Sequence, residues 1–599
     1  MHSHITYNPL QRETQKFVDK DCNVVVLAPT SSGKTIVAEQ FLFPAMKAGK
    51  KGLYLSPLKA LTNEKLLDWE KTQFSVVAIT SDHESKPRPI TEDLILMTTE
   101  ALDSRTRGIK QWLTEVGVIV CDEAHMLTVS GRGDAMEVGL TRFANEINRD
   151  ARIIFLSATI PNADELGEWL TVLNGKPTEV VTTEWRPIRQ EHHLKTAKEK
   201  EWLFNDDAID VIQRVQDKYP DDQMIIFVHS IGKGKTIAQR LGVPFHYSKV
   251  SKADRQNLEK LFKEKKIKTL VSTSTLAYGI NLPADIGIIV GAHRGPTMVE
   301  AYDIIQMAGR VGRYGLSEKG LVYYVFKESY ADMMWNQITN MHPVESQLAS
   351  RLYFHITSFV CRENKQIDDI KYFVSKTLLG QQQEVDVEES INKLLKYGIL
   401  KQNEDGMLIP TLIGKASAMM YVDPIDLVTL RENLKSKPVN PRDIAIAFTN
   451  IPSLDVPTYV PDDLKRKIDM GSGQQTILAS ALYSWLLGDD LFGTAAQVIP
   501  PYIADIERIM AALKIAGVSK SYLDTIQIRL TYGVNENMID LVSIRGIGRK
   551  RAFALSRLGI NNREDMLKKP TVVKNVLGTK LGMSVLAMIK DPTKPMIIY

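Results

Sequence analysis

Ala28-Pro29-Thr30-Ser31-Ser32-Gly33-Lys34-Thr35 lies between an apolar run at residues 24–28 and the start of an amphipathic helical pattern. A strand, a glycine-containing loop and a helix in this order form a phosphate-binding loop, in which backbone N–H groups at the helix N-terminus face phosphate oxygens. We expect Lys34 to reach the β and γ phosphates of ATP, the Thr35 hydroxyl to ligate Mg²⁺, and Gly33 to allow close backbone approach. The predicted nucleotide-binding residues of the loop are Pro29, Thr30, Ser31, Ser32, Gly33, Lys34 and Thr35.

Apolar runs beyond this loop indicate two α/β domains. Up to about residue 330 they alternate with helical patterns, and continuous β-rich runs of this kind are typical of parallel sheets covered on both faces. The expected strands are residues 24–28, 52–56, 94–98, 116–121 and 153–157, followed by 224–228, 269–272, 286–290 and 321–325. We therefore predict one α/β domain at residues 1–190 and a second at 191–341, joined near a polar stretch at residues 184–200.

The chain turns mainly helical after about residue 342. Residues 347–423 fit three helices and a short hairpin at 399–411 that turns at Asp405-Gly406, which predicts a winged-helix domain at 342–423. Helices dominate residues 424–535, with breaks predicted at 437–438, 451–452 and 500–501. A small helical module follows at residues 536–599.

Charge is concentrated at the end of the chain. From Leu541 to Tyr599 there are 12 basic and 3 acidic residues, a net charge of +9, whereas the whole chain carries only +4. A localised basic module favours contact with a polyanion. The alternative is a solvated lysine-rich tail without such a partner.

Composition excludes several classes of protein. The 599 residues are too many for one compact core, and 3 cysteines are too few for a disulfide framework or a four-cysteine metal cluster. The histidines show no metal-ligand spacing. Neither a signal peptide nor an apolar run of membrane-spanning length stands in the sequence. We therefore expect a cytoplasmic multidomain protein that is not secreted and has no membrane contact.

The acidic motif Asp122-Glu123-Ala124-His125 ends the expected strand at residues 116–121. Carboxylates at the C-terminal end of a parallel strand lie in the crevice where ligands bind. We expect Asp122 to hold Mg²⁺ and Glu123 to polarise the attacking water. The alternative is an acidic helix start. Ser157-Ala158-Thr159, after the next strand, fits a hydroxyl pair that couples the nucleotide site to a bound polymer.

The motif Gln306-Met307-Ala308-Gly309-Arg310-Val311-Gly312-Arg313 lies in the second α/β domain. Arg310 and Arg313 would share a helix face, and guanidinium groups suit phosphate oxygens. An arginine brought to the γ-phosphate by a second domain can raise the rate by ~10³-fold or more. We predict Gln306, Arg310 and Arg313 as catalytic residues beside Lys34, Asp122 and Glu123, with the neighbouring glycines allowing close domain approach. A surface salt-bridge pair is the alternative.

Five further segments occur in the order known from one enzyme superfamily. They are Leu10-Gln11, Ser56-Pro57-Leu58-Lys59-Ala60-Leu61, Thr98-Thr99-Glu100, Val228-His229-Ser230 and Thr273-Ser274-Thr275-Leu276-Ala277-Tyr278-Gly279-Ile280-Asn281-Leu282-Pro283. With the motifs above, they resemble the superfamily-two helicases of the DExH type. The resemblance implies two RecA-like parallel-sheet motor domains closing on ATP, with Gln11 reading the adenine and Gly279 at the nucleotide site. It also implies contacts with a nucleic-acid track from Ser56, Lys59, Thr98, Thr99 and Thr273.

The basic end of the chain narrows the resemblance. Leu541-Val542-Ser543-Ile544-Arg545-Gly546-Ile547-Gly548-Arg549-Lys550-Arg551-Ala552 is similar to a helix–hairpin–helix, whose glycine turn grips a phosphate without reading bases. Gly546, Gly548, Arg549 and Lys550 are the expected contacts, in a helix–hairpin–helix domain at 536–599. With a winged helix and a long helical domain before it, the whole chain resembles the archaeal Hjm-type repair helicases and the helicase part of polymerase theta, in the Ski-two-like branch.

That resemblance implies a monomeric, ATP- and Mg²⁺-dependent motor that moves 3′ to 5′ on single-stranded DNA and unwinds forked duplexes in repair or replication restart. It implies a helical ratchet domain at 424–535, with a ratchet helix starting near Tyr502 and carrying Arg508. Ile515 stands where the family has a base-stacking tryptophan, or, in another alignment, no aromatic residue lies closer than Tyr502. The strand-splitting hairpin expected between residues 290 and 306 is short, and Pro296 restricts strand pairing, so unwinding is expected to be weaker than translocation.

Other functions fit part of the sequence. An RNA helicase of the same branch shares the motor motifs, and the compact basic helix–hairpin–helix favours DNA over it. A nucleic-acid-stimulated ATPase with weak unwinding is a further alternative. A scaffold without catalysis conflicts with the full set of catalytic residues, and an ATPase switch with a protein partner conflicts with the basic tail.

Overall fold

The computed structural model describes residues 7–57, 59–80, 89–108, 110–158, 160–273, 282, 284–294, 297–312, 317, 319–340, 342–465, 467–468, 470 and 473–591. The chain forms two compact units. The first runs to Ser350 and includes Lys371–Val385; the second comprises Arg351–Ile370 and the chain from Asp386 onward.

The first unit begins with a parallel sheet. Within the described residues its strand order is β3-β4-β2-β5-β6-β1-β7, and every neighbouring pair is parallel. The strands are β1 (Asn23–Leu27), β2 (Lys51–Ser56), β3 (Val76–Ile79), β4 (Leu94–Thr98), β5 (Val116–Asp122), β6 (Arg152–Ser157) and β7 (Thr178–Thr182). Five of them match the predicted runs to within one residue at each end.

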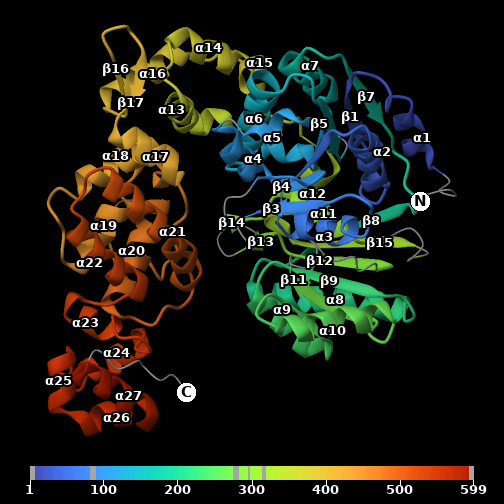
Figure 1. Cartoon of the computed structure of the whole chain (residues 1–599). Helices are drawn as coiled ribbons and strands as arrows, with labels where there is room; N and C mark the ends of the chain where they lie inside the picture. Colours follow the sequence, from blue (N-terminus) through green and yellow to red (C-terminus); the bar gives the residue numbers. More distant parts are fainter. Residues whose placement is uncertain are drawn as a thin grey trace. The chain divides into compact units, whose positions relative to one another are not determined.

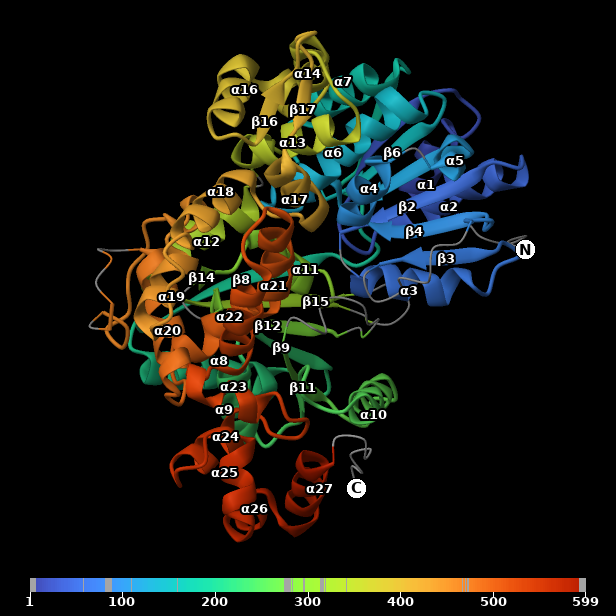
Figure 2. The same cartoon turned by 60° about the vertical axis from the view of Figure 1, so that its left-hand side comes forward.

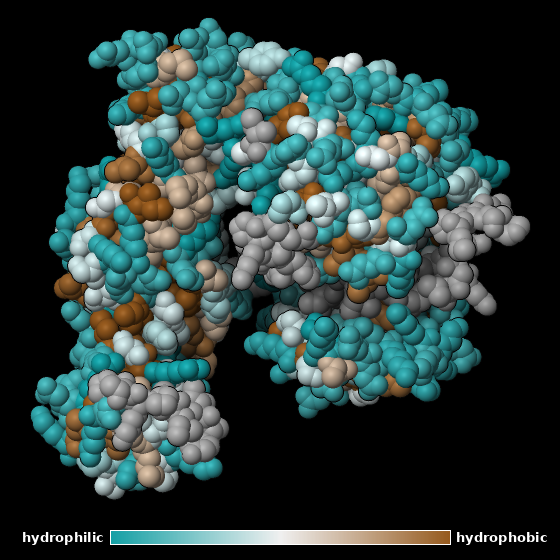
Figure 3. Space-filling view, in the orientation of Figure 1, coloured by the Kyte–Doolittle hydropathy of each residue, from teal (hydrophilic) through white to brown (hydrophobic). Residues whose placement is uncertain are grey.

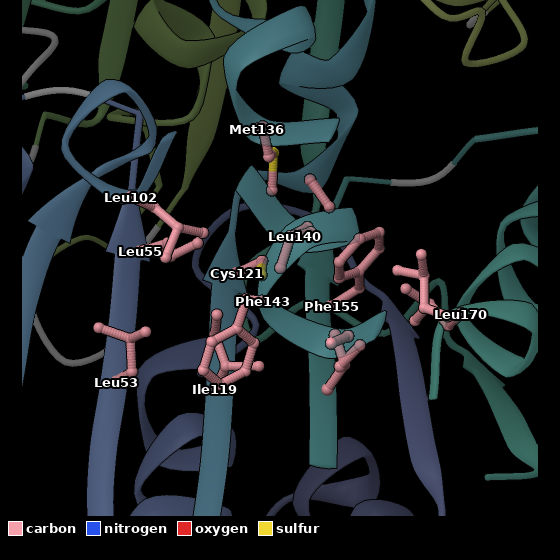
Figure 4. Close-up of a cluster of buried hydrophobic side chains, with 14 of the residues drawn as sticks. Leu53, Leu55, Leu102, Ile119, Cys121, Met136, Leu140, Phe143, Phe155 and Leu170 are labelled. Carbon is pink, nitrogen blue, oxygen red and sulfur yellow. The ribbon is translucent and has the colours of Figure 1, made fainter. Parts of the chain in front are cut away.

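Helices cover both faces of this sheet (Figure 1). They are α1 (Pro9–Gln15), α2 (Lys34–Lys47), α3 (Lys59–Trp69), α4 (Thr99–Thr106), α5 (Gln111–Thr114), α6 (Gly133–Arg142) and α7 (Ala163–Asn174). Alternate residues of β1 enter different cores: Val25 and Leu27 pack with α4, α6 and α7, whereas Val24 and Val26 pack with α1 and α2. Figure 4 shows the first of these cores, where Met136 and Leu140 of α6 lie over Cys121 of β5.

The second sheet of this unit is also parallel, with the order β10-β11-β9-β12-β15-β8. Its strands are β8 (Gln190–Ala197), β9 (Met224–Val228), β10 (Phe245–His246), β11 (Thr269–Thr273), β12 (Ile286–Val290) and β15 (Gly320–Lys327). Its helices are α8 (Glu201–Lys218), α9 (Ile231–Leu241), α10 (Lys252–Lys263), α11 (Ala301–Ala308) and α12 (Glu328–Thr339). The predicted fold class, two parallel-sheet motor domains followed by helical domains, is confirmed.

Two details of the second sheet differ from or refine the prediction. The polar stretch expected as a joint at residues 184–200 contains β8, an edge strand with many exposed side chains, which is why it lacks an apolar run. The expected hairpin between residues 290 and 306 is present as β13 (His293–Arg294) paired antiparallel with β14 (Thr297–Met298), and its strands are only two residues long.

The second unit is mainly helical, and its helices α19 to α22 pack side by side in both views (Figures 1 and 2). Its elements are α13 (Leu352–Arg362), α14 (Ile367–Ser375, whose end belongs to the first unit), α16 (Val387–Lys396), β16 (Leu400–Gln402), β17 (Leu408–Pro410), α17 (Leu412–Met420), α18 (Pro424–Asn433), α19 (Pro441–Thr449), α20 (Gln474–Leu487), α21 (Ala495–Ile515), α22 (Lys520–Tyr532), α23 (Ile539–Val542), α24 (Arg549–Ser556), α25 (Arg563–Lys568), α26 (Pro570–Leu577) and α27 (Thr579–Lys590).

Two expectations for this helical part are wrong. Four helices, α13, α14, α15 (Leu378–Gln382) and α16, precede the β16–β17 hairpin where three were expected. The Pro500-Pro501 pair does not break the helices, because both prolines lie inside α21. The hairpin itself and its turn near Gly406 are as predicted. The winged-helix assignment and the five domain boundaries stay predictions.

The surface is largely hydrophilic on the face shown in Figure 3. No helix within the described ranges is long and apolar enough to cross a membrane.

A buried carboxyl holds the Lys371–Val385 segment in the first unit. Glu137 of α6 accepts hydrogen bonds from Ser346 Oγ at 2.6 Å and from Leu379 N at 2.8 Å. Burial raises the pKa of Glu137 to about 7, although both hydrogen bonds lower it. Trp169 adds a second link by donating to Lys376 O at 3.0 Å.

We predict that Glu137→Gln stabilises the protein above pH 7. Because the folded pKa is raised, stability is highest at low pH and is lost as the pH rises from about 4.5 to about 7. Glutamine does not ionise, and it can accept from Leu379 N and donate to Ser346 Oγ. The gain at high pH should be roughly 2–3 kcal/mol, measured by urea unfolding below and above this window. Glu168→Gln, at an exposed acid of α7, is the control. An identical pH dependence in wild type and Glu137→Gln would refute the assignment.

Candidate active site

The phosphate loop connects β1 to α2, as the sequence predicts. Gly33 caps α2 with φ 90°, in the left-handed region, and a Cβ there would lie 2.5 Å from Gln11 Nε2. The positive φ therefore favours glycine, and a side chain here would displace the Gln11 amide. Lys34 Nζ donates to Ala28 O at 2.9 Å, so its ammonium lies over the loop.

Gln11 is buried and fixes α1 to this loop. It forms a capping box with Asn8, in which Gln11 N donates to Asn8 Oδ1 at 3.0 Å and Asn8 N donates to Gln11 Oε1 at 3.1 Å. Gln11 Nε2 and Asn8 Nδ2 then donate to the carbonyls of Gly33 at 3.4 Å and Ser32 at 2.9 Å. Adenine recognition by Gln11 stays a prediction.

The acidic motif lies at the C-terminal end of β5, in the middle of the sheet. Asp122 Oδ1 accepts from Glu123 N at 3.0 Å, and Asp122 Oδ2 accepts from the buried Tyr54 hydroxyl. Burial raises the pKa of Asp122, and the charge of Glu123 adds to this effect, while the Tyr54 hydrogen bond opposes it. Tyr54 on β2 was missed because a tyrosine in an apolar strand looks like a core residue.

The donor set beside Asp122 fits a magnesium ion. Mg²⁺ prefers oxygen ligands and takes only one or two from protein side chains, and Thr35 Oγ1 and Asp122 offer such oxygens. Lys65 Nζ of α3 donates to Thr35 Oγ1 at 2.7 Å, and its charge lowers the pKa of Asp122. The Lys65 ammonium therefore lies beside the oxygens that would bind the magnesium ion. Lys65, inside a polar helix, gave no sequence signal.

Glu123 links the two motor domains. It has φ 53° and ψ 47°, a left-handed conformation that is costly for a residue with a Cβ. Its side chain is buried, and Gln306 Nε2 from α11 of the second domain donates to Glu123 Oε1 at 2.9 Å. The predicted catalytic residues Glu123 and Gln306 are thus brought together across the domain boundary.

His125 links the acidic motif to Ser157. Burial lowers the pKa of His125 to about 3, so the ring is neutral. Its Nδ1 lies 3.0 Å from Ser157 Oγ and accepts from Ala158 N at 3.4 Å, which places the ring proton on Nε2. Tyr302 of α11 contacts the same ring, with centroids 4.4 Å apart. Thr159, the other hydroxyl of that motif, lies outside the described residues.

The arginine motif differs from its prediction in one respect. The helix α11 ends at Ala308, so Arg310 lies beyond it. The prediction that Arg310 shares a helix face with Arg313 is therefore wrong. Arg310 is buried, and Gly309 approaches the phosphate loop so closely that a Cβ would lie 2.7 Å from Thr30 Oγ1. Gly312 instead packs against Gly320 of its own domain. Arg313 and Gly279 lie outside the described residues.

The comparisons agree with this geometry. Residues 8–166 match the family described as DEAD/DEAH box helicase, and residues 206–315 match the helicase conserved C-terminal domain. A protein of Thermoplasma acidophilum named ATP-dependent DNA helicase Hel308 is 27% identical, with 95% of this chain and 93% of that protein covered. A protein of the same name from Thermoplasma volcanium is 26% identical, with 93% of this chain and 92% of that protein covered. Another from Pyrococcus horikoshii is 25% identical, with 94% of this chain and 90% of that protein covered.

The two family matches and the similarity over nearly the whole chain support a superfamily-two helicase of the Hel308/Hjm type.

The track-contact residues expected of such a helicase lie at strand ends. Ser56 ends β2 and Thr98 ends β4, and the two are register partners in neighbouring strands. Thr99 begins α4 and is buried, Lys59 begins α3, and Thr273 ends β11 of the second sheet. Contacts of these residues with nucleic acid stay a prediction.

In the second unit, two arginines expected at DNA have other partners. Arg508 on α21 donates to the carbonyl of Tyr421 and, at 3.1 Å, to Asp505 Oδ1. Arg549 donates to the carbonyls of Asp489 at 2.9 Å and Trp485 at 3.1 Å, and its guanidinium carbon lies 4.0 Å from the Trp485 ring centroid. These bonds fix Arg549 to the C-terminal end of α20, and its contact with a phosphate stays a prediction. Gly546 has φ 89° in the turn before α24, and Gly548 and Lys550 are exposed.

We predict that Gln306→Leu lowers kcat for ATP by on the order of 10²-fold and changes nucleotide affinity little. The substitution removes the donor that the second domain supplies to Glu123, so the predicted catalytic carboxylate loses its link to that domain. Steady-state ATPase assays measure the effect. Gln216→Leu on α8, which removes a similar hydrogen bond to Thr269 Oγ1 of β11, is the matched control. A normal kcat in Gln306→Leu would count against the contact.

We predict that alanine substitutions at two neighbouring residues of α24 have different effects. Arg549→Ala should lower the stability of the second unit by about 2 kcal/mol, because backbone carbonyls lose a charged donor. Lys550→Ala should leave stability unchanged and weaken DNA binding. Thermal unfolding and fluorescence anisotropy with labelled DNA separate the two. Unchanged stability in Arg549→Ala would show that its carbonyl contacts matter little.

Proposed function

We propose that this protein is an ATP-dependent DNA helicase that moves 3′ to 5′ on single-stranded DNA and unwinds forked DNA in repair or replication restart. The observation that carries the proposal is the hydrogen bond between Glu123 and Gln306, which joins two RecA-like domains at the acidic motif. Relatives that cover nearly the whole chain and are named ATP-dependent DNA helicase support DNA as the substrate.

In the proposed cycle, ATP is bound by the phosphate loop and closes the two domains. Lys34 holds the β and γ phosphates, Glu123 orients the attacking water, and Arg310 and Arg313 stabilise the charge on the phosphoryl group. Mg²⁺, held by Thr35 and Asp122, would neutralise charge between the β and γ phosphates. Loss of the γ-phosphate contacts lets the domains separate, so that the grip on the track alternates between them.

The track is proposed to run over the strand ends of both domains. Ser56, Lys59, Thr98 and Thr99 would bind from the first domain and Thr273 from the second. The basic C-terminal module would add phosphate contacts at Gly546, Gly548 and Lys550. The two-residue strands of the β13–β14 hairpin favour weak duplex splitting. We propose that the protein acts as a monomer, since one chain supplies every residue named for these sites.

The test is ATP hydrolysis without nucleic acid, with single-stranded DNA and with single-stranded RNA of matched length. We expect strong stimulation by DNA, followed by unwinding of a fork with a 3′ tail. Stimulation by RNA that equals or exceeds that by DNA would favour an RNA helicase of the same branch.

Lys34→Ala and Arg313→Ala should each abolish turnover while DNA binding persists. Each removes a positive side chain proposed to contact the phosphates, and neither removes a proposed contact with the track. Normal DNA-stimulated ATPase in either variant would sink the assignment. Arg105→Ala, on α4 of the first domain, serves as the control for a lost surface charge.

A further inference from the structure

The connector between the motor domains reaches the phosphate loop. It comprises the seven residues between the end of β7 at Thr182 and the start of β8 at Gln190. Within it, Arg186 Nη2 donates to Thr30 Oγ1 of the loop at 3.2 Å. Its other terminal nitrogen, Nη1, donates to Gln190 Oε1.

Gln190 carries this contact into the second domain. Gln190 Nε2 donates to Ala308 O at 2.7 Å and to Val311 O at 2.6 Å. These two carbonyls flank Gly309 and Arg310, so Gln190 fixes the turn that presents the predicted catalytic arginine. A continuous chain of hydrogen bonds therefore runs from Thr30 through Arg186 and Gln190 to that turn.

The Arg186 guanidinium lacks an anionic partner. In the part of the chain that the structure describes, no carboxylate lies within ion-pair distance of it, and its Nε is buried without a hydrogen-bond partner. Burial lowers the pKa of Arg186 to about 10, so the group is still a cation at neutral pH. A largely buried cation without a counter-charge is costly, which favours a site where an anion binds.

The position of Thr30 indicates which anion. At this point the second domain meets the loop, since Ser31 Oγ donates to Gly309 O at 3.4 Å and a Cβ on Gly309 would clash with Thr30. The predicted adenine side of the loop lies elsewhere, where Gln11 contacts Gly33. An arginine that arrives where two domains meet is suited to the terminal phosphate.

We propose that Arg186 binds the terminal phosphate of a nucleoside triphosphate, and that Gln190 ties the Gly309-Arg310 turn to the same group. A guanidinium presents several N–H donors in a plane, so Arg186 can keep its bond to Thr30 while Nε turns to a phosphate oxygen. The connector would then report whether the γ-phosphate is present. The inference rests on the proposed ATP hydrolysis.

Binding of ATPγS and ADP, both with Mg²⁺, tests the proposal. Arg186→Ala should weaken ATPγS by about 10- to 100-fold and leave ADP within about 3-fold of wild type, as expected for loss of a charge-assisted hydrogen bond. Arg189→Ala, three residues away and exposed, should change neither affinity. Arg186→Lys keeps the charge, should recover part of the ATPγS affinity, and keeps the test usable if the alanine variant misfolds.

Gln190→Leu separates binding from positioning. It removes the bonds to the turn and one hydrogen bond of the guanidinium, which keeps its charge and its bond to Thr30. We therefore expect kcat to fall by a larger factor than the ATPγS affinity. Equal weakening of ATPγS and ADP by Arg186→Ala, or no change in either, would overturn the inference. A wild-type protein that binds neither nucleotide would instead refute the proposed function.

Discussion

A buried carboxylate of the acidic motif that accepts its hydrogen bond from another domain is the constraint on which the rest of this structure depends. Glu123 Oε1 accepts from Gln306 of the second domain, and Glu123 Oε2 is buried without a hydrogen-bond partner. Burying a charged oxygen is unfavourable unless it is paired or hydrogen-bonded. Glu123 therefore keeps its hydrogen bond from Gln306 only while the two sheets are docked, which ties the state of the acidic motif to domain closure.

Parallel strands make this arrangement possible. Because the described strands of the first sheet run in one direction, β1 and β5 end on the same edge and bring Lys34 and Asp122 to that edge. The second sheet repeats the design, and its arginine turn at Gly309 meets the loop of the first. Tyr54 of β2 adds a hydrogen bond to Asp122, and Lys65 of α3 adds one to Thr35.

Buried parallel strands also explain which parts of the fold could be predicted. The run Met224–Val228 is apolar throughout because both of its faces are covered, and its bounds were predicted to the residue. The edge strands β7 and β8 carry exposed polar side chains and left no such run. The motifs located Lys34, Glu123 and Gln306, whereas Arg186 could not be recognised, because its importance comes from its neighbours in space. In the second unit a count of basic residues could not separate Arg549, which binds carbonyls, from Lys550, which faces solvent.

The connector is short as well as polar, and its length limits how the motor domains can move. Seven residues, fully extended, span roughly 25 Å at most, and Gln190 already pairs with Gly320 as the first residue of β8. The second domain therefore cannot drift away on a loose tether. If the second domain rotates about this segment, the far edge at β10 travels furthest and the arginine turn, beside the pivot, moves least. In such a rotation a small change at a phosphate would become a larger displacement at the distant edge of the sheet.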